Sequence, residues 1–174
     1  MRMRNVLAAL AALILAAPIT ASAQQQQQTI QFSTHAGLGA PVGRLGDNTN
    51  MGFNLGLRGE MPMNPKWGFR GDASWDRFGR RAASGSYSYY ALAGNLTHYE
   101  SPRLYEFGGL GVYRSEVSGG SGLTANDNNL GIQGGVGLNM TADQLKTFVE
   151  FGLTGVFAQS TTNWWFPVRV GIRF

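Results

Sequence analysis

A strict alternation of apolar and polar residues recurs along most of this 174-residue chain. In the final stretch, FPVRVGIRF, every second residue is apolar, and Pro167, Arg169, Gly171 and Arg173 stand between the apolar ones. Neighbouring side chains of an extended strand point to opposite faces of its sheet, so a period of two indicates a strand with two unlike faces. The pattern occurs in eight segments, which are residues 30–38, 51–61, 67–76, 90–97, 104–114, 130–140, 149–157 and 166–174.

The segments and their connections predict an all-β fold that crosses a membrane. About ten residues is the length that a tilted strand needs to cross a hydrocarbon core. We expect short turns at 62–66, 98–103 and 141–146, longer polar loops at 40–50, 77–86 and 115–128, and a shorter loop at 159–163. Short turns at one end and longer loops at the other are typical of outer-membrane barrels, whose turns lie in the periplasm. The prediction is an eight-stranded antiparallel up-and-down transmembrane β-barrel.

Aromatic residues gather near the ends of the predicted strands. Trp67, Tyr99 and Tyr105 lie near the short turns, and Trp75, Tyr113, Trp164 and Trp165 lie near the loops. Amphipathic rings favour the two headgroup levels of a membrane, so we expect two aromatic girdles. A soluble β-sandwich also alternates, but it has no need of aromatic belts at the strand ends or of charged residues on an inward face.

The N-terminal residues resemble a secretory signal peptide. Arg2 and Arg4 precede an apolar run that ends in Ala21-Ser22-Ala23, a small-residue pattern typical of a cleavage site. The run is short for a single-span membrane anchor. We therefore expect residues 1–23 to be removed, the Gln24–Gln28 stretch to be an unstructured leader, and residues 29–174 to form the barrel.

Composition excludes several classes of function. The chain has no cysteine, which excludes disulfide bonds and thiol catalysis. Removal of Arg2 and Arg4 lowers the formal charge from +4 to about +2, and the remaining basic residues are scattered along the chain. Nucleic acid is therefore not an expected partner.

Charged residues recur on the predicted inward face, and they are Arg58, Glu60, Arg70, Asp72, Asp76, Glu106, Glu150, Arg169 and Arg173. The fifth segment is irregular, because placing Glu106 inside puts Leu110 and Val112 on the wrong face; we therefore expect a β-bulge near Gly108 and Gly109. An eight-stranded barrel has room inside only for side chains, and unpaired charges there are costly. We expect these charges to pair, with Glu150 facing Arg169 on neighbouring strands. Structural filling is the expected role, and a narrow water path is the alternative.

The chain resembles the small bacterial outer-membrane β-barrel proteins of the OmpA and OmpX type over all of residues 29–174. In that group the last strand ends in Phe with apolar residues at every second position before it. Here that pattern is Phe166, Val168, Val170, Ile172 and Phe174, although an aromatic residue is commoner where Ile172 stands. The resemblance implies a place in the bacterial outer membrane, contact with its lipid, and recognition of this ending by the barrel-assembly machinery, with periplasmic chaperones as further partners during biogenesis.

The motifs that resemble active sites are weak. Two glycine-rich stretches, 37–43 and 131–137, are not followed by a helical pattern, so neither predicts a phosphate-binding loop. His98-Tyr99-Glu100-Ser101 has the residue types of a hydrolase site, and some outer-membrane lipid A deacylases are eight-stranded barrels with a His and a Ser close together. Here the string falls in a predicted periplasmic turn and departs from the deacylase pattern. His35 has no second histidine nearby. We expect no catalytic site, no cofactor and no metal site.

The expected function is structural, or is exercised by the surface loops with a partner that the sequence does not identify. Arg77, Arg80 and Arg81 in the second loop are expected to contact the phosphates of lipopolysaccharide, because cations form charge-assisted hydrogen bonds with such groups. Two other functions remain open: a narrow porin-like channel for small solutes or ions, and a lipid-modifying outer-membrane enzyme. The fold alone does not choose among them.

Overall fold

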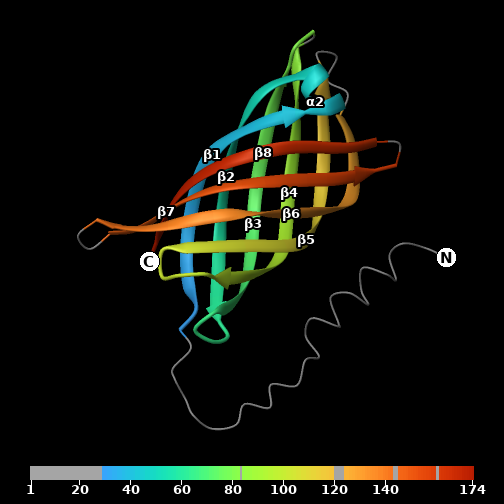
Figure 1. Ribbon diagram of the computed structural model, residues 1–174. Coiled ribbons are helices and arrows are strands. Elements are labelled where there is room, and N and C mark those ends of the chain that lie inside the picture. The colour runs from blue at the N-terminus through green and yellow to red at the C-terminus, as the bar shows by residue number, and fades with distance from the viewer. Residues whose placement is uncertain (1–28, 83, 120–123, 143–144, 160) are drawn as a thin grey trace, which may run out of the picture.

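The structure is a computed structural model that describes residues 29–82, 84–119, 124–142, 145–159 and 161–174. Eight antiparallel strands form a closed barrel in which each strand pairs with its sequence neighbours and β8 returns to β1 (Figure 1). The predicted fold class is confirmed. The predicted signal peptide and Gln-rich leader lie outside the described residues.

The strands follow one another around the barrel, with a short helix after the first. Their bounds are β1 Gln31–Val42, α2 Gly43–Asn48, β2 Thr49–Pro62, β3 Trp67–Arg80, β4 Gly85–Tyr99, β5 Leu104–Gly119, β6 Thr124–Ala142, β7 Leu145–Ala158 and β8 Thr161–Arg173. The β2–β3, β4–β5 and β6–β7 connections lie at the end that holds Phe174, which we call the turn end. The opposite end, which holds α2, is the loop end (Figure 1).

The strands are longer and the loops shorter than the sequence predicted. They run from 12 residues in β1 to 19 in β6, and the ladder between β4 and β5 continues through much of the predicted loops, as far as the pair Gly85 and Gly119. The alternation of apolar and polar residues marks only the part of each strand whose outer face contacts hydrocarbon. Beyond that part, polar residues pair equally well through their backbones.

The predicted loop 40–50 contains the helix α2, which the sequence reading missed. Its Leu45 is buried, and the Thr49 hydroxyl donates to the Leu45 carbonyl at 2.7 Å. The register between β2 and β3 shifts between Thr49 and Gly52, directly after this helix. Within the described residues, no helix is long and apolar enough to cross a membrane, a finding that does not bear on strands.

The two faces of the barrel wall are inverted relative to a soluble protein. Large apolar side chains cover the outside, and Leu92 and Leu110 are 70% and 69% exposed. Charged and amide side chains such as Arg70, Asn95 and Glu150 are buried inside. Exposure of this much apolar surface fits a wall that faces hydrocarbon, with its polar face turned to the lumen.

The strand β5 is regular, which corrects two predictions. Its register with β4 and β6 continues without a shift through Gly108 and Gly109, so the predicted bulge is absent. Tyr105 and Phe107 are buried inside, and Glu106 therefore points outward and is exposed. The prediction that Glu106 faces the lumen is wrong, because apolar side chains occupy both faces of this strand and the alternation alone does not identify the inner one.

Glycines on the neighbouring strands make room for these inward rings. Gly137 lies opposite Tyr105, and a Cβ atom at Gly137 would come within 2.2 Å of the tyrosine ring. Gly171 has the same relation to Phe148, with a ring atom at 2.2 Å. Aromatic side chains fit inside this narrow barrel because the residues beside them have no side chain.

The predicted aromatic girdles are only partly present. Trp67, Trp75 and Trp164 lie on the outward face, and Trp75 packs between Phe53 and Tyr90 at ring distances of 5.1 and 6.1 Å. The rings of Tyr105, Tyr113 and Trp165 are buried in the lumen, and Tyr99 bonds to an inward carboxylate. Placing these four residues in the girdles was wrong, because position near a strand end does not determine which face a ring occupies.

We expect Val170→Arg to lower the free energy of unfolding by about 2–4 kcal/mol, because Val170 is exposed on the outer face at the middle of the apolar row from Phe166 to Phe174. Thr162→Arg, near the loop end of the same strand, should cost only about 0–1 kcal/mol. Reversible urea unfolding in liposomes measures both. Equal losses for the two variants would contradict the assignment of this face to hydrocarbon.

Candidate functional site: the polar lumen

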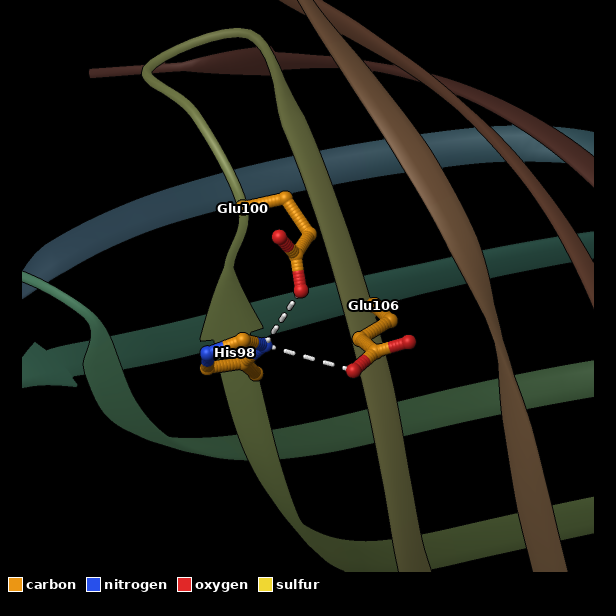
Figure 2. A group of neighbouring side chains, drawn as sticks. All are labelled: His98, Glu100 and Glu106. Carbon is orange, nitrogen blue, oxygen red and sulfur yellow. Dashed lines mark hydrogen bonds and ion pairs between the residues drawn. The ribbon is translucent and has the colours of Figure 1, made fainter.

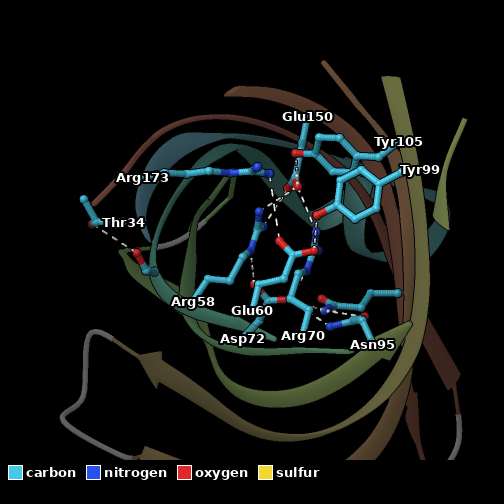
Figure 3. Close-up of polar contacts among 12 residues, drawn as sticks. Thr34, Arg58, Glu60, Arg70, Asp72, Asn95, Tyr99, Tyr105, Glu150 and Arg173 are labelled. Atoms are coloured by element: carbon cyan, nitrogen blue, oxygen red, sulfur yellow. Dashed lines mark hydrogen bonds and ion pairs between the residues drawn. The ribbon is translucent and has the colours of Figure 1, made fainter. Parts of the chain in front are cut away.

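Four charged side chains form a closed ring across the lumen. Arg58 comes from β2, Arg70 and Asp72 come from β3, and Glu150 comes from β7. Figure 3 shows these side chains converging inside the barrel. Each belongs to the inward set of its strand, so the alternation of three strands places all four in one space.

Each arginine of this ionic ring contacts both acids. Arg58 donates from Nη1 and Nη2 to the two oxygens of Glu150, each at 2.8 Å, and from Nε to Asp72 at 2.7 Å. Arg70 donates from Nε to Asp72 at 2.8 Å and from Nη1 to Glu150 at 2.9 Å. Two positive and two negative groups balance, so the ring adds no net charge to the interior. Bidentate arginine–carboxylate pairs are among the strongest hydrogen bonds in proteins.

Neutral side chains complete the hydrogen bonding around the ionic ring. Asn95 donates to Asp72 at 2.8 Å, and the amide of Gln133 donates to Asn95 at 3.0 Å. The Tyr105 hydroxyl donates to Glu150 at 2.8 Å. A buried carboxylate is stabilised when each of its lone pairs accepts a hydrogen bond. These three residues supply hydrogen-bond donors in addition to those of the arginines.

Aromatic faces cover the two arginines. The guanidinium carbon of Arg70 lies 3.8 Å from the centre of the Phe107 ring, and that of Arg58 lies 4.8 Å from the centre of the Phe148 ring. A cation over a ring face gains electrostatic stabilisation where water is absent. The rings therefore close the space beside the ionic ring while remaining compatible with its charge.

The other predicted lumen charges lie nearer the ends of the barrel. Toward the turn end, Glu60 accepts a hydrogen bond from Tyr99 and lies 3.9 Å from Arg173. Toward the loop end, Asp76 accepts a hydrogen bond from the Trp165 indole at 3.2 Å. Arg169 is buried, and its Nε has no hydrogen-bond partner among the described residues.

The structure differs from the expected pairing of Glu150. Glu150 and Arg169 stand opposite each other on β7 and β8, but both oxygens of Glu150 are bonded to Arg58. Their positions on neighbouring strands predicted this pair, whereas the sequence does not identify which of the other inward charges reaches Glu150 from across the lumen. Because the lumen is narrow, an arginine from across it reaches the same carboxylate.

A cluster of buried aromatic residues lies inside the barrel toward the loop end. The rings of Phe78, Tyr89 and Tyr113 lie 5.6, 4.9 and 6.3 Å from the ring of Trp165, and all four are buried. Leu45 of α2 belongs to the same buried cluster. This aromatic plug, defined by these five residues, was not predicted. Tyr113 and Trp165 had been assigned to a girdle, and Phe78 and Leu45 to loops.

Among the described residues, those with catalytic potential, His35, His98 and Ser101, form no hydrogen bond with one another. Both ring nitrogens of His35 are buried in the lumen without a hydrogen-bond partner. Ser101, in the β4–β5 turn, accepts hydrogen bonds from the backbone amides of Arg103 and Leu104 at 3.3 and 3.0 Å. The Nδ1 of His98 lies near two carboxylates on the outer surface. The string from His98 to Ser101 therefore forms a turn in which the serine caps the backbone.

The predicted arginines of the second loop are at the loop end of β3 or just beyond it. Arg77 is exposed, Arg80 lies over the Tyr87 ring at 6.0 Å, and Arg81 donates from Nε to the Thr49 carbonyl at 2.9 Å. The last two have partners within the protein. The five residues of the C-terminal pattern, Phe166, Val168, Val170, Ile172 and Phe174, are all exposed on the outer face.

The ionic ring predicts strong coupling between Arg58 and Glu150. Truncation of either residue to alanine should cost about 3–5 kcal/mol, because it leaves buried charge uncompensated. In a double-mutant cycle the coupling energy should be about 2–3 kcal/mol for Arg58 with Glu150 and below about 1 kcal/mol for Arg169 with Glu150. Urea unfolding of the single and double variants in liposomes gives both values. A larger coupling for Arg169 would show that Glu150 pairs along the sheet instead of across the lumen.

Comparison with known proteins gives the same architecture. Residues 8–174 match the model of the outer membrane protein beta-barrel domain family, whereas the comparison with curated proteins gave no match. Among solved structures, the attachment invasion locus protein Ail of Yersinia pestis is 18% identical with a TM-score of 0.54, over 83% of this chain and 99% of that one.

Two further solved structures are similar at the level of the fold. Neisserial surface protein A is 16% identical with a TM-score of 0.61, over 83% of this chain and 95% of that one. The N-terminal β-barrel domain of Pseudomonas aeruginosa OprF is 12% identical with a TM-score of 0.52, over 85% of this chain and 100% of that one. The predicted location in the bacterial outer membrane is confirmed, and this chain belongs to the outer membrane protein beta-barrel domain family.

Proposed function

We propose that this protein is a non-conducting outer-membrane barrel that acts as a structural component or through its exposed loop end. The observation that carries the proposal is that buried side chains pack across the lumen at two levels. The ionic ring of Arg58, Arg70, Asp72 and Glu150 fills the middle, and the aromatic plug around Trp165 fills the loop end.

The closure at each level has a different physical basis. Ions crossing the ionic ring would have to separate pairs at 2.7–2.9 Å, in which each acid already binds both arginines. Water and ions crossing the aromatic plug would have to pass between packed rings, of which Trp165 and Tyr113 are hydrogen-bonded to Asp76 and Gln133. An eight-stranded barrel leaves little space around either layer.

A narrow channel is the second candidate, and one observation favours it. Buried polar atoms of His35, Asn54, Thr154 and Arg169 have no hydrogen-bond partner among the described residues. Buried polar groups in this position are commonly served by water. Water at these atoms would form part of a polar path, which the ionic ring and the aromatic plug would still interrupt.

We further propose that the protein is not an enzyme. Catalysis by a serine requires a base within hydrogen-bond reach of its hydroxyl. The Ser101 hydroxyl accepts hydrogen bonds from two backbone amides, and the Nδ1 of His98 faces Glu100 and Glu106. This arrangement supports a turn and a surface cluster, and it offers no nucleophile with a base.

Contact with lipopolysaccharide is proposed for Arg77 in particular. Arg77 is exposed, on the same outward face as Trp75 and one step closer to the loop end. Trp75 packs with Phe53 and Tyr90, so this row of rings fits the headgroup level. A cation beyond such a row lies where the phosphates of the outer leaflet are expected. Arg80 and Arg81 are weaker candidates, since both have partners within the protein.

The C-terminal pattern from Phe166 to Phe174 is proposed as the signal that the barrel-assembly machinery reads, after delivery by periplasmic chaperones. Its apolar side chains are exposed along one face of β8, where a protein partner has access before the barrel meets lipid.

The closure of the lumen predicts the electrical behaviour of the protein. The unaltered chain should give no steady ionic current in planar bilayers. Trp165→Ala and Arg58→Ser should each remain closed because the other layer persists, whereas the double variant should conduct. Far-UV circular dichroism should show an intact barrel for each. A stable current through the unaltered chain, with an ion selectivity that changes in Arg169→Ala, would favour the channel instead.

The lipopolysaccharide contact predicts a local effect of charge. Arg77→Gln should weaken binding of purified lipopolysaccharide by about two- to fivefold, the range for an exposed ionic contact of about 0.5–1 kcal/mol. The matched control is Arg103→Gln, which removes an exposed arginine at the turn end. Each variant is titrated with lipopolysaccharide in detergent, and the rise in its unfolding temperature measures the strength of binding. Equal weakening by the two variants would contradict a site at the loop end.

A further inference from the structure

Three potential metal ligands meet on the outer surface at the turn end. His98 near the end of β4 stands directly opposite Glu106 of β5, and Glu100 follows in the turn between the two strands. Figure 2 shows both carboxylates directed at one edge of the imidazole ring. Because β4 and β5 pair in a regular ladder, the facing of His98 and Glu106 is fixed by the backbone.

One nitrogen of the imidazole lies close to two carboxylates at once. The Nδ1 atom of His98 lies 3.3 Å from an oxygen of Glu100 and 3.2 Å from an oxygen of Glu106. One ring nitrogen carries at most one hydrogen, so it does not form a full hydrogen bond to both carboxylates at once. Neither glutamate has an ion pair with lysine or arginine among the described residues. A single cation bound by all three atoms would satisfy each of them.

We propose that His98, Glu100 and Glu106 form a binding site for a divalent transition-metal ion of the Zn²⁺ class. Zinc binds imidazole nitrogen and carboxylate oxygen at about 2.0–2.2 Å, so two ligand atoms at a tetrahedral angle lie about 3.4 Å apart. The two separations from His98 Nδ1, 3.2 and 3.3 Å, are close to this value. All three ligand atoms lie within 4.8 Å of one another, so only the two exposed carboxylates need to move together.

The choice of metal follows from the ligand set. Ca²⁺ and Mg²⁺ favour shells made of oxygen, whereas an imidazole nitrogen suits zinc and its neighbours in the first transition row. Two carboxylates supply the negative charge that balances a divalent ion. Three protein ligands leave at least one position open, as in zinc sites that hold water.

The surroundings position the histidine and leave the site accessible. The Trp67 ring lies 4.5 Å from the imidazole at an interplanar angle of 42°, on the neighbouring strand β3. It covers the imidazole on one side, while Nδ1 faces the carboxylates. The side chains of Glu100 and Glu106 are 58% and 59% exposed, so an ion reaches them from outside the barrel. The site does not involve the lumen and is independent of the proposed function.

Binding of the ion would join β4, the turn and β5 through one centre. A ligand that binds only the folded state stabilises that state in proportion to its occupancy. Zinc is therefore expected to raise the unfolding temperature of this barrel by several degrees, and the rise should depend on all three ligands.

The test is a titration of the chain, prepared without an affinity tag, with zinc chloride in detergent micelles. Isothermal titration calorimetry should show one saturable site, with no competition from equimolar Mg²⁺. His98→Ala and Glu106→Gln should each weaken zinc binding by at least about tenfold, since loss even of an outer-shell partner has an effect of that size. Both variants should also lose the rise in unfolding temperature.

The matched control is Glu116→Gln, which removes another β5 carboxylate, one that pairs with Arg114 at 3.1 Å. It should bind zinc as the unaltered chain does. Far-UV circular dichroism should show that every variant keeps the barrel. The proposal is overturned if the unaltered chain shows no saturable binding up to millimolar zinc. It is equally overturned if His98→Ala binds as tightly as Glu116→Gln.

Discussion

Pairing between β1 and β8 closes the sheet, and this closure decides what surroundings each side chain meets. In hydrocarbon an unpaired backbone edge is too costly to persist, so a membrane sheet must return to its first strand. Ser33 to Val42 of β1 pair with Arg173 to Trp164 of β8, which leaves no edge along this length. Once the sheet is closed, the two faces of every strand become lipid-facing and lumen-facing. The exposed leucines outside and the buried charges inside both follow from this division.

The same closure explains why the interior is a network of charges and not an apolar core. A barrel of eight strands has a lumen about two side chains wide, so charges from opposite walls meet. Arg58 and Arg70 reach Glu150 from across the lumen, and both also hold Asp72. Removal of one charge leaves its partners buried without compensation, so the four side chains stabilise the barrel only as one unit. The aromatic plug adds a second layer of packed rings toward the loop end.

The outer surface at the turn end has a different character from the hydrocarbon-facing wall above it. Here His98, Glu100 and Glu106 lie together beside Trp67. Deeper in the membrane, the same outer face carries apolar side chains. Glu106 reaches this surface because Tyr105 and Phe107 occupy the lumen face of β5. The prediction that placed Glu106 inside therefore hid the cluster, because a lumen-facing Glu106 could not meet His98. A wrong assignment of the two faces of β5 therefore separated three potential ligand residues that lie together on the outer surface.

The sequence by itself determined the strand count, the closed antiparallel fold and the inward face of most strands, because a period of two is a local property that burial enforces residue by residue. It also identified Arg58, Arg70, Asp72 and Glu150 as inward charges. Only the tertiary structure decided which of them meet, since partners 80 and 92 residues apart are joined by the curvature of the barrel. It alone decided the face of β5, where aromatic residues occupy the lumen beside glycines of the next strand and both faces look apolar. The placement of Trp165 in the plug and of Glu106 beside His98 has the same cause. Near a strand end, a ring or a carboxylate is stable on either face of the sheet. The side chains of the neighbouring strands then decide which face it occupies.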